Sequence, residues 1–430
     1  MGSPLRRPEY PVLVPGVAAT RPGALLPADV RTSFPALAET AEIYLDSAAT
    51  TQKPRAVVQT VRDYHAVATA NAARGTYPWA TVLTQRIAAV RARTARFLGA
   101  AHTDEIVFTG GATAALNAVA LSWGLTALAD GDEILYSPRD HAANIAPWFL
   151  LRDTLAHFGR RIELVPYRVT ADGRADTTDI AGKLGTRTRL LTVTHLHHVY
   201  GALSTLAELR DRMPERVLLC FDCSQSGGHI PVDVAALGAD FAAFAAHKMF
   251  GAPGNGILYC RRRIHSALRP FLPGGTTDAS LTAAGFAGGV MPGLLEGGTP
   301  DIPGILSLGA ALDVLGSYGM PAIAAHNREL TGRLIRGLRA VPGVSFLPGP
   351  AHGSGDDGYG IVSFTLAGIS AADLGFVLAE YGFLVRTGTH CVPEAAGEPE
   401  SVRVSTHIYT GIDDIDRFVA CVRTLAEELS

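Results

Sequence analysis

The feature that most restricts the fold is an alternation between short apolar runs rich in β-branched residues and longer stretches rich in Ala, Leu and Arg. The runs are EIVFTG (105–110), EILYS (133–137), IELVPY (162–167), RLLTVTH (189–195), VLLCFD (217–222), DFAAFAA (240–246) and GILYC (256–260). Strands separated by helix-length segments predict crossover connections. Such connections give parallel strands that are covered on both faces. We therefore predict an α/β fold with a mostly parallel, seven-stranded sheet.

The pattern changes on both sides of this region. Residues 1–28 are rich in Pro, Ala and Gly and predict a flexible arm, which a helix-like stretch at 29–37 and a short strand at 43–46 follow. After about residue 300 come two long helical stretches and four short strands, at 344–348, 361–366, 383–388 and 402–406. Helices with mixed strands predict a second, smaller domain of α+β type. We place the large domain at 29–300 and the small C-terminal domain at 301–430.

Composition excludes several classes of protein. The formal net charge is −3, and no basic run appears beyond the short CRRR at 260–263. We therefore expect no nucleic-acid partner. No run of about 18 apolar residues is present, so we expect no membrane span. Five scattered cysteines do not suggest a disulfide framework, and we expect a cytoplasmic protein.

One lysine lies in an unusual place. Lys248 ends the apolar stretch ADFAAFAAH and precedes a Gly/Pro-rich turn, although an unpaired buried ammonium is costly. The chain has only two other lysines, Lys53 and Lys183. In the ordinary interpretation, Lys248 ends a strand and extends its charged group to solvent. In the functional interpretation, burial deprotonates Lys248, so that its amine can attack an aldehyde.

Other polar side chains follow the carboxyl ends of the predicted strands, where open parallel sheets bind ligands. His141 follows 133–137, and Asp222 and Gln225 end or follow 217–222. GATAALNAVAL follows 105–110, and its helix start with the Thr113 hydroxyl suits a phosphate, although an ordinary strand–helix turn looks the same. Pyridoxal 5′-phosphate needs such a set: a Schiff-base lysine, a carboxylate at its ring nitrogen and a phosphate anchor.

Six motifs strengthen this interpretation through a resemblance. They are YLDSAATTQKP (44–54), DHAANIAPW (140–148), FDCSQSGGHIPVD (221–233), HKMFGAPGNGILY (247–259), EGGTPDIPGI (296–305) and VRTGTHC (385–391). In this order they resemble the cysteine-desulfurase-like enzymes of class V aminotransferase fold, and most closely the branch of SufS, CsdA and selenocysteine lyase. The resemblance covers about residues 29–427. It implies pyridoxal-phosphate fold type I, an amino-acid substrate and a homodimer.

The resemblance also implies residue roles on the cofactor. Lys248 would form the Schiff base, His141 would stack on the ring, Asp222 would pair with the ring nitrogen and Gln225 would bond the phenolic oxygen. Thr113 and His247 would hold the phosphate, with Thr299 reaching in from the second subunit. Ala112 and His198 occupy further cofactor-binding positions.

On the substrate side, the resemblance assigns the α-carboxylate to Arg403, whose guanidinium fork matches a carboxylate. Cys391 falls at the position of the nucleophile that forms a persulfide. We count Arg386 and Arg74 as further substrate-binding candidates, and a sulfur-acceptor protein as a candidate partner. Without the resemblance, Arg403 would be taken for a surface strand residue and Cys391 for an inert buried thiol.

The chain departs from the family pattern around the sulfur-handling part. Ala245 replaces a phosphate-holding serine, and His198 replaces an asparagine that contacts the ring oxygen. Ala112 to Ala115 read Ala-Thr-Ala-Ala where the family has Thr-Thr-Glu-Gly, and 71–75 read Asn-Ala-Ala-Arg-Gly where it has Asn-Val-His-Arg-Gly. The loop between Cys391 and Arg403 is also shorter. These changes leave the predicted cofactor chemistry intact.

Three functional hypotheses follow. The first is cleavage of the C–S bond of cysteine or a cysteine derivative, through an aldimine at Lys248 and a persulfide on Cys391. The second keeps the cofactor but acts on an S-conjugated cysteine or another amino acid by β-elimination, transamination, epimerisation or decarboxylation. The third is a non-catalytic or nucleotide-binding module that uses GGATAA as a dinucleotide turn. The acidic residue that such a turn requires would be Asp130 or Asp132, and neither lies at the end of a second predicted strand.

Two smaller motifs could suggest a metal. His195 and His197 have the spacing of two ligands on one strand face, but no carboxylates accompany them, and we expect no metal site. Cys220 and Cys223 have CxxC spacing without a second pair, so we predict core residues.

Overall fold

The computed structural model describes residues 26, 28–72, 75–275, 280–283, 285–287, 289–352 and 358–429. The arm predicted for 1–28 lies almost entirely outside these residues. Within them, the predicted large sheet of seven strands is confirmed, in the order β2-β8-β7-β6-β5-β3-β4. Its strands are β2 (Ile106–Thr109), β3 (Glu133–Tyr136), β4 (Glu163–Pro166), β5 (Thr188–Thr194), β6 (Leu218–Asp222), β7 (Phe241–Ala245) and β8 (Gly256–Cys260). The pairs from β4 to β7 are parallel, and β8 is antiparallel to both of its neighbours.

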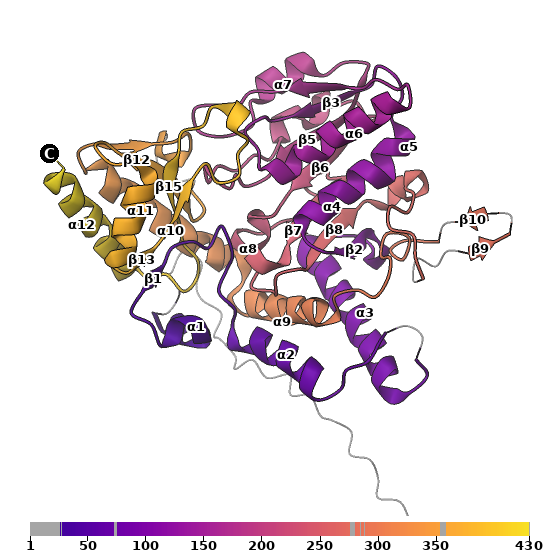
Figure 1. Ribbon diagram of the computed structural model, residues 1–430, viewed down its shortest axis with the longest axis horizontal. Coiled ribbons are helices and arrows are strands. Elements are labelled where there is room, and N and C mark those ends of the chain that lie inside the picture. The colour runs from indigo at the N-terminus through magenta and orange to yellow at the C-terminus, as the bar shows by residue number, and fades with distance from the viewer. Residues whose placement is uncertain are drawn as a thin grey trace, which may run out of the picture.

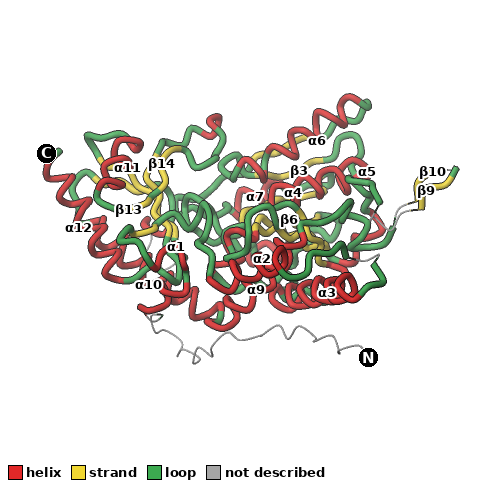
Figure 2. The backbone as a smooth tube through the Cα atoms, turned by 60° about the horizontal axis from the view of Figure 1, so that its bottom comes forward, coloured by secondary structure: helices red, strands yellow, loops and turns green. Residues whose placement is uncertain are grey.

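Helices cover both faces of this sheet, as a mostly parallel sheet requires. Because side chains alternate along a strand, neighbouring residues such as Phe244 and Ala245 belong to different hydrophobic clusters. One cluster packs against α4 (Ala112–Val119) and α6 (Ala146–His157). The other packs against α3 (Pro78–Leu98), α7 (Thr177–Lys183) and α9 (Ile302–Tyr318). Figure 2 shows α9 between α2 (Arg55–Ala66) and α3 along one side of the molecule.

A second sheet lies beside the first, on the left of Figure 1. Within the described residues it is antiparallel, in the order β11 (Val344–Phe346), β12 (Ile361–Leu366), β15 (Ser401–Ser405) and β14 (Arg386–Gly388). It packs against α10 (Met320–Arg339), α11 (Ala371–Glu380) and α12 (Ile412–Glu428), which share its hydrophobic cluster. The α+β character predicted for this region is thus observed. The boundary at residue 300 remains a prediction, because α9 packs on helices of the large-sheet side.

Three local predictions were wrong. The single strand predicted at 383–388 is divided: β13 (Phe383–Leu384) pairs in parallel with β1 (Ile43–Tyr44), whereas β14 joins the second sheet. The helix-like stretch at 29–37 is a 3-10 helix at Ala28–Ser33 followed by the short α1 (Pro35–Ala38). His195 lies just after β5, so His195 and His197 do not share a strand face.

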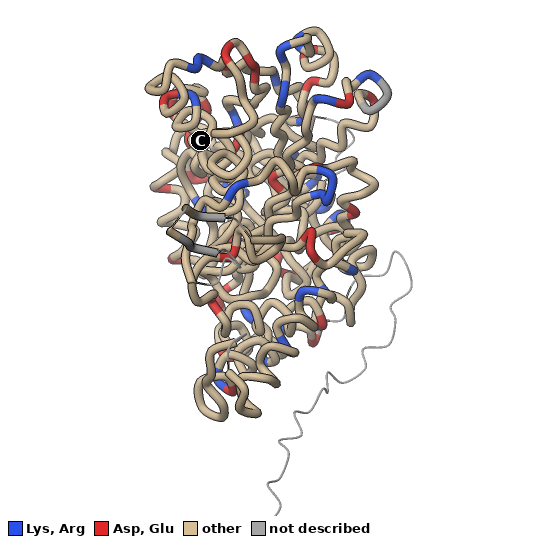
Figure 3. The backbone as a smooth tube through the Cα atoms, turned by 90° about the vertical axis from the view of Figure 1, so that its right-hand side faces the viewer, with Lys and Arg blue, Asp and Glu red and all other residues tan. Residues whose placement is uncertain are grey.

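The arrangement brings the carboxyl ends of β5, β6 and β7 toward one edge of the second sheet. The segment after β1 joins the two sheets, because Asp46 forms a parallel bridge with Ser405 of β15. The backbone positions of Lys and Arg are interspersed with those of Asp and Glu in Figure 3. Among the described helices, no single one is long and apolar enough to cross a membrane, and only α9 with α10, bent by 73°, would pass as a pair by length and composition.

Candidate active site

A cavity of about 400 Å³ opens where the two sheets meet. Eleven residues proposed from the sequence line it: Ala112, Thr113, His141, His198, Asp222, Gln225, His247, Lys248, Arg386, Cys391 and Arg403. Thr299 is exposed and is not part of this lining, so its role in the site of a second subunit remains a prediction. Arg74 lies outside the described residues. Segments far apart in the sequence thus converge on one place.

Lys248 ends the short 3-10 turn Ala246–Lys248, which directly follows β7. Burial is the main reason why the pKa of its amine is lowered to about 8, and the Asp222 carboxylate opposes this shift. A large fraction of this amine is therefore neutral near pH 8, as attack on an aldehyde requires.

Asp222 is the last residue of β6 and is buried. Its Oδ1 accepts hydrogen bonds from Ser224 at two atoms, the backbone N–H at 2.9 Å and the hydroxyl at 2.5 Å. The side chain is thereby fixed in one orientation while Oδ2 is left for another donor. A carboxylate held in this way can keep a proton on a ring nitrogen.

Gln225 follows on the same turn and is also buried. Its Nε2 donates to the carbonyl of Ala48 at 2.8 Å, and its Oε1 has no partner among the described residues. The backbone carbonyl of Gln225 lies 2.8 Å from Nδ1 of His229, which anchors the turn from behind. One side of the amide is therefore fixed and the other remains available to a ligand.

The start of α4 forms the phosphate-binding candidate. Gly111 precedes the helix with φ of +130°, a conformation that favours glycine. The neighbouring strand approaches so closely that a Cβ at Gly256 would lie 2.5 Å from the Cα of Gly111. The first N–H groups of a helix are free of intrahelical partners and attract anions. With the hydroxyl of Thr113 and the ring of His247, they form one end of the cavity.

Two histidines that line the cavity contact each other. The rings of His141 and His198 have centroids 5.1 Å apart and meet edge to face. Nδ1 of His141 accepts a hydrogen bond from the N–H of Ala143 at 3.1 Å, so its neutral tautomer carries the proton on Nε2. Burial lowers the pKa of both imidazoles, so both are neutral at physiological pH. Both ring nitrogens of buried His198 lack partners among the described residues.

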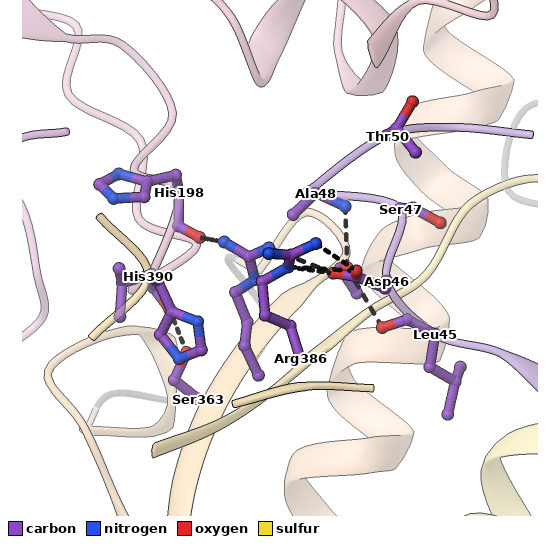
Figure 4. A network of polar contacts seen from close by, with 12 residues as sticks. Leu45, Asp46, Ser47, Ala48, Thr50, His198, Ser363, Arg386 and His390 are labelled. Atoms are coloured by element: carbon purple, nitrogen blue, oxygen red, sulfur yellow. Dashed lines mark hydrogen bonds and ion pairs between the residues drawn. The ribbon is translucent and has the colours of Figure 1, made fainter. Parts of the chain in front are cut away.

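Two arginines, Arg386 and Arg403, also line the cavity, and Figure 4 shows Arg386 in the network of polar contacts that holds them. Arg403 is 3% exposed; its Nη1 donates to the carbonyl of His198 at 3.0 Å and its Nη2 to Asp46 at 3.3 Å. Its Nε has no partner among the described residues. Arg386 binds the same carboxylate, with Nη2 3.0 Å from Oδ2. Sequence reasoning assigned no role to Asp46, although it lies in one of the quoted motifs.

Cys391 is an exposed thiol at the mouth of this cavity. It and His390 both have positive φ, +68° and +56°, which is unusual for residues other than glycine. The backbone carbonyl of Cys391 accepts a hydrogen bond from the N–H of Ala142 at 3.0 Å, beside His141. Further along the same loop, Glu398 binds the hydroxyl of Tyr200 at 2.6 Å and Arg139 at 3.0 Å. The loop that carries the thiol is therefore attached to the large-sheet side.

The other cysteines differ from Cys391. Cys220 and Cys223 are buried in the core as predicted, and burial raises their pKa values well above the ordinary range. Cys421 lies on α12 and is not part of the cavity.

The cavity is lined by polar atoms without protein partners, which is the property expected of a ligand site. Among the described residues, most of the buried side-chain nitrogen and oxygen atoms that lack a partner lie here: Thr194 Oγ1, both nitrogens of His198, Gln225 Oε1, Asn255 Oδ1, His390 Nδ1 and Arg403 Nε. A pyridoxal-phosphate ring needs an amine, a carboxylate, polar groups at its edge and an anion site. The residues present fit that group.

Comparisons with known proteins agree with this geometry. Residues 43–418 match the family model for aminotransferase class V. A cysteine desulfurase of Cronobacter sakazakii is 36% identical over 402 residues, which cover 91% of this chain and 96% of that protein. The structure is similar to that of cysteine desulfurase CsdA from Escherichia coli (TM-score 0.84, 31% identity, 94% and 99% of the two chains). It is also similar to a cysteine desulfurase from Thermococcus onnurineus (TM-score 0.87, 29% identity, 96% and 100%).

Proposed function

Because the chain belongs to the aminotransferase class V family, we propose that it is a pyridoxal-phosphate enzyme that removes the sulfur of cysteine, a cysteine desulfurase. One observation carries this proposal: the amine of Lys248, the guanidinium of Arg403 and the thiol of Cys391 line one cavity. The first two suit any amino-acid substrate of this cofactor. Desulfuration requires the thiol of Cys391 in addition to these two groups.

The cofactor, when bound, draws electron density away from the α-carbon of an amino acid. The protein supplies the rest. Arg403 binds the α-carboxylate, because its buried Nε–H has no partner among the residues that the structure describes. Lys248 takes the α-proton and returns it, which its pKa of about 8 allows. Asp222 keeps a proton on the ring nitrogen through the oxygen that Ser224 leaves free.

Cys391 accepts the sulfur. Its thiolate attacks the substrate sulfur, so that an S–S bond forms and the C–S bond breaks. The electron pair of the broken bond remains on the substrate carbon, which takes up a proton and leaves as alanine. The enzyme then carries a persulfide, and a second thiol must remove its terminal sulfur. We propose that this acceptor is a protein or small-molecule thiol that reaches Cys391 at the exposed mouth of the cavity.

The test compares three proteins loaded with cofactor: the wild type, Cys391→Ala and Cys421→Ala. The wild type and Cys421→Ala are expected to convert cysteine to alanine and to carry one extra sulfur atom on the peptide with Cys391. Cys391→Ala should bind cysteine, seen in the visible spectrum, without releasing alanine. Pyruvate and ammonia as products, or alanine production that survives in Cys391→Ala, would contradict the proposal and favour elimination without a persulfide.

A further inference from the structure

Phe250 has a backbone conformation that is unusual for a large side chain. Its φ is +68°, in the left-handed region that glycine enters readily and that strains a bulky residue. It follows Lys248 by two residues and is fully buried. Strain of this kind persists only where the surrounding structure compensates for it, and it is frequent at functional sites.

The left-handed residue ends the short turn Ala246–Lys248. The N–H of Gly251 donates to the carbonyl of Ala246 at 2.9 Å, a bond that needs a left-handed residue directly before its donor. Glycine commonly occupies that position at the end of a helix. Here Phe250 occupies it, and its own N–H donates to Thr51 Oγ1 at 3.0 Å. The chain therefore has a strained phenylalanine where glycine would be free of strain.

The contacts of the Phe250 ring give a reason for this choice. The ring meets that of Phe34 edge to face, with centroids 5.4 Å apart, and lies 4.5 Å from the ring of His407. Tyr409 also borders this group, at 4.9 Å from Phe34 and 6.5 Å from Phe250. We call Phe34, His407 and Tyr409 the aromatic box. Aromatic pairs at such distances contribute more than the area that they bury.

The aromatic box comes from parts of the chain that are distant in sequence from Lys248. Phe34 directly precedes α1, and the other two members lie between β15 and α12. The hydroxyl of Tyr409 lies 2.8 Å from that of Ser47, which gives the box a polar anchor. The ring of Phe250 therefore attaches the turn of Lys248 to the loop that follows β15.

We propose that Phe250 is a positioning residue that holds the amine of Lys248 in its place in the cavity. The ring fixes the turn from which the flexible lysine side chain extends into the cavity. In cofactor capture the amine nitrogen bonds to the aldehyde carbon, and the aldehyde oxygen leaves as water with the two amine hydrogens. An amine held beside the aldehyde reacts fastest. The inference rests on the proposed function only for Lys248 as the reacting amine.

The experiment compares Phe250→Leu with Phe418→Leu in the cofactor-free full chain. Phe418 is also a fully buried ring that packs on other rings, but it lies on α12 in the hydrophobic cluster of the second sheet. Both substitutions remove a buried ring of the same size, so both should lower the stability to urea. Stopped-flow absorbance after mixing with pyridoxal phosphate gives the rate of capture.

Phe250→Leu is expected to capture pyridoxal phosphate about tenfold more slowly than the wild type, because a displaced amine meets the aldehyde less often. Phe418→Leu should capture it at the wild-type rate. A wild-type rate in folded Phe250→Leu, or the same loss of rate in both variants, would overturn the proposal. Failure of the desulfurase proposal would change the products formed from cysteine and leave these rates as they are.

A second variant keeps the test decisive if Phe250→Leu does not fold. Phe34→Leu leaves the turn of Lys248 unchanged and removes one member of the aromatic box, and Phe34 does not line the cavity. It should slow capture in the same direction but by a smaller factor, because two members of the box remain. Capture at the wild-type rate in folded Phe34→Leu would also overturn the proposal.

Discussion

The side-chain nitrogen of Lys53 lies 2.8 Å from the carbonyl oxygen of His247, the residue before Lys248. The same oxygen accepts hydrogen bonds from the N–H of Thr51 at 3.0 Å and from the hydroxyls of Thr51 and Thr50 at 3.0 and 3.2 Å. Lys53 also donates to the carbonyl of Thr51 at 2.6 Å. The segment 50–53 thus holds the turn that positions Lys248.

Replacing Lys53 with Met should therefore weaken the attachment of this turn. The change leaves the Thr51 carbonyl short of a donor, so we expect the free energy of unfolding to fall by about 1–3 kcal/mol. The loosened turn should also lower the affinity for pyridoxal phosphate. Urea denaturation of the cofactor-free protein and a binding titration measure the two effects separately.

Lys183→Met is the matched control. Lys183 makes a partly exposed pair with Asp179 on α7, and neither residue lines the cavity. Its loss should lower the free energy of unfolding by no more than about 1 kcal/mol and leave cofactor affinity unchanged. Equal effects of the two substitutions would show that Lys53 has no special role.

The pH dependence of cofactor uptake follows from the lowered pKa of Lys248. Only the neutral amine reacts with the aldehyde, so the rate of reconstitution should rise with pH and level off above about pH 8, the pKa that burial gives this lysine. An ordinary lysine would continue to gain reactivity up to about pH 10.4. Stopped-flow absorbance at several pH values measures the midpoint.

Asp222→Asn sharpens this test. The Asp222 carboxylate stabilises the ammonium form and so raises the pKa of Lys248 against the effect of burial. Its removal should move the midpoint to lower pH. A midpoint that stays in place or rises would mean that Asp222 and Lys248 do not interact in the cavity.

Glu398 should control how firmly the Cys391 loop is held. Glu398→Gln weakens the contacts to Arg139 and Tyr200, so the thiol should lose its fixed place beside Ala142. We expect turnover of cysteine to fall several-fold while cofactor binding is unchanged. We also expect faster cleavage of the loop by protease, because local opening exposes it.

Glu394→Gln provides the comparison within the same loop. Glu394 is exposed in the short 3-10 turn Glu394–Ala396. The Glu394→Gln substitution should leave both turnover and proteolysis at the wild-type level. If Glu394→Gln and Glu398→Gln behaved alike, the contacts of Glu398 would not be what orders the loop.

Gly256 permits the close approach of β8 to the start of α4. Gly256→Ala would place a methyl group against backbone atoms of Gly111 and Phe244, at 2.5 to 2.7 Å, so the phosphate end of the cavity must shift. We expect weaker binding of pyridoxal phosphate and of inorganic phosphate. Calorimetry with phosphate alone measures this without the lysine chemistry.

Gly182→Ala is the control for that substitution. Gly182 lies inside α7 with nothing within 4 Å of the added carbon. Alanine there should leave phosphate binding unchanged and stabilise the protein by up to about 1 kcal/mol. Loss of phosphate affinity in both variants would point to a general effect of added methyl groups.

Local pattern was sufficient for the large sheet, because its central strands are buried and form short apolar runs that helix-length segments separate. It was insufficient where pairing is long-range. Phe383 and Arg386 belong to one apolar-rich stretch, yet Phe383 pairs with Ile43 and Arg386 with Arg403. The two residues belong to different sheets because Phe383 pairs with β1, which lies more than 300 residues earlier in the chain.

The same reason explains the site residues that sequence reasoning missed. Residues at the ends of the predicted strands were found, because the topology of a parallel sheet places them together. Asp46 and Lys53 follow a short strand outside that sheet, and nothing local shows which partners they meet. One signal was present: Lys53 is one of only three lysines and lies in a quoted motif.

The proposed function requires that the amine of Lys248 captures the cofactor aldehyde. The direct measurement is borohydride reduction of the protein with pyridoxal phosphate, followed by digestion and mass spectrometry of the lysine peptides. Because the chain has only Lys53, Lys183 and Lys248, each amine is resolved in one experiment. The added mass should be found on the Lys248 peptide and be lost in Lys248→Ala. Stoichiometric label on Lys53 or Lys183 in the wild type, or none at all, would contradict the account.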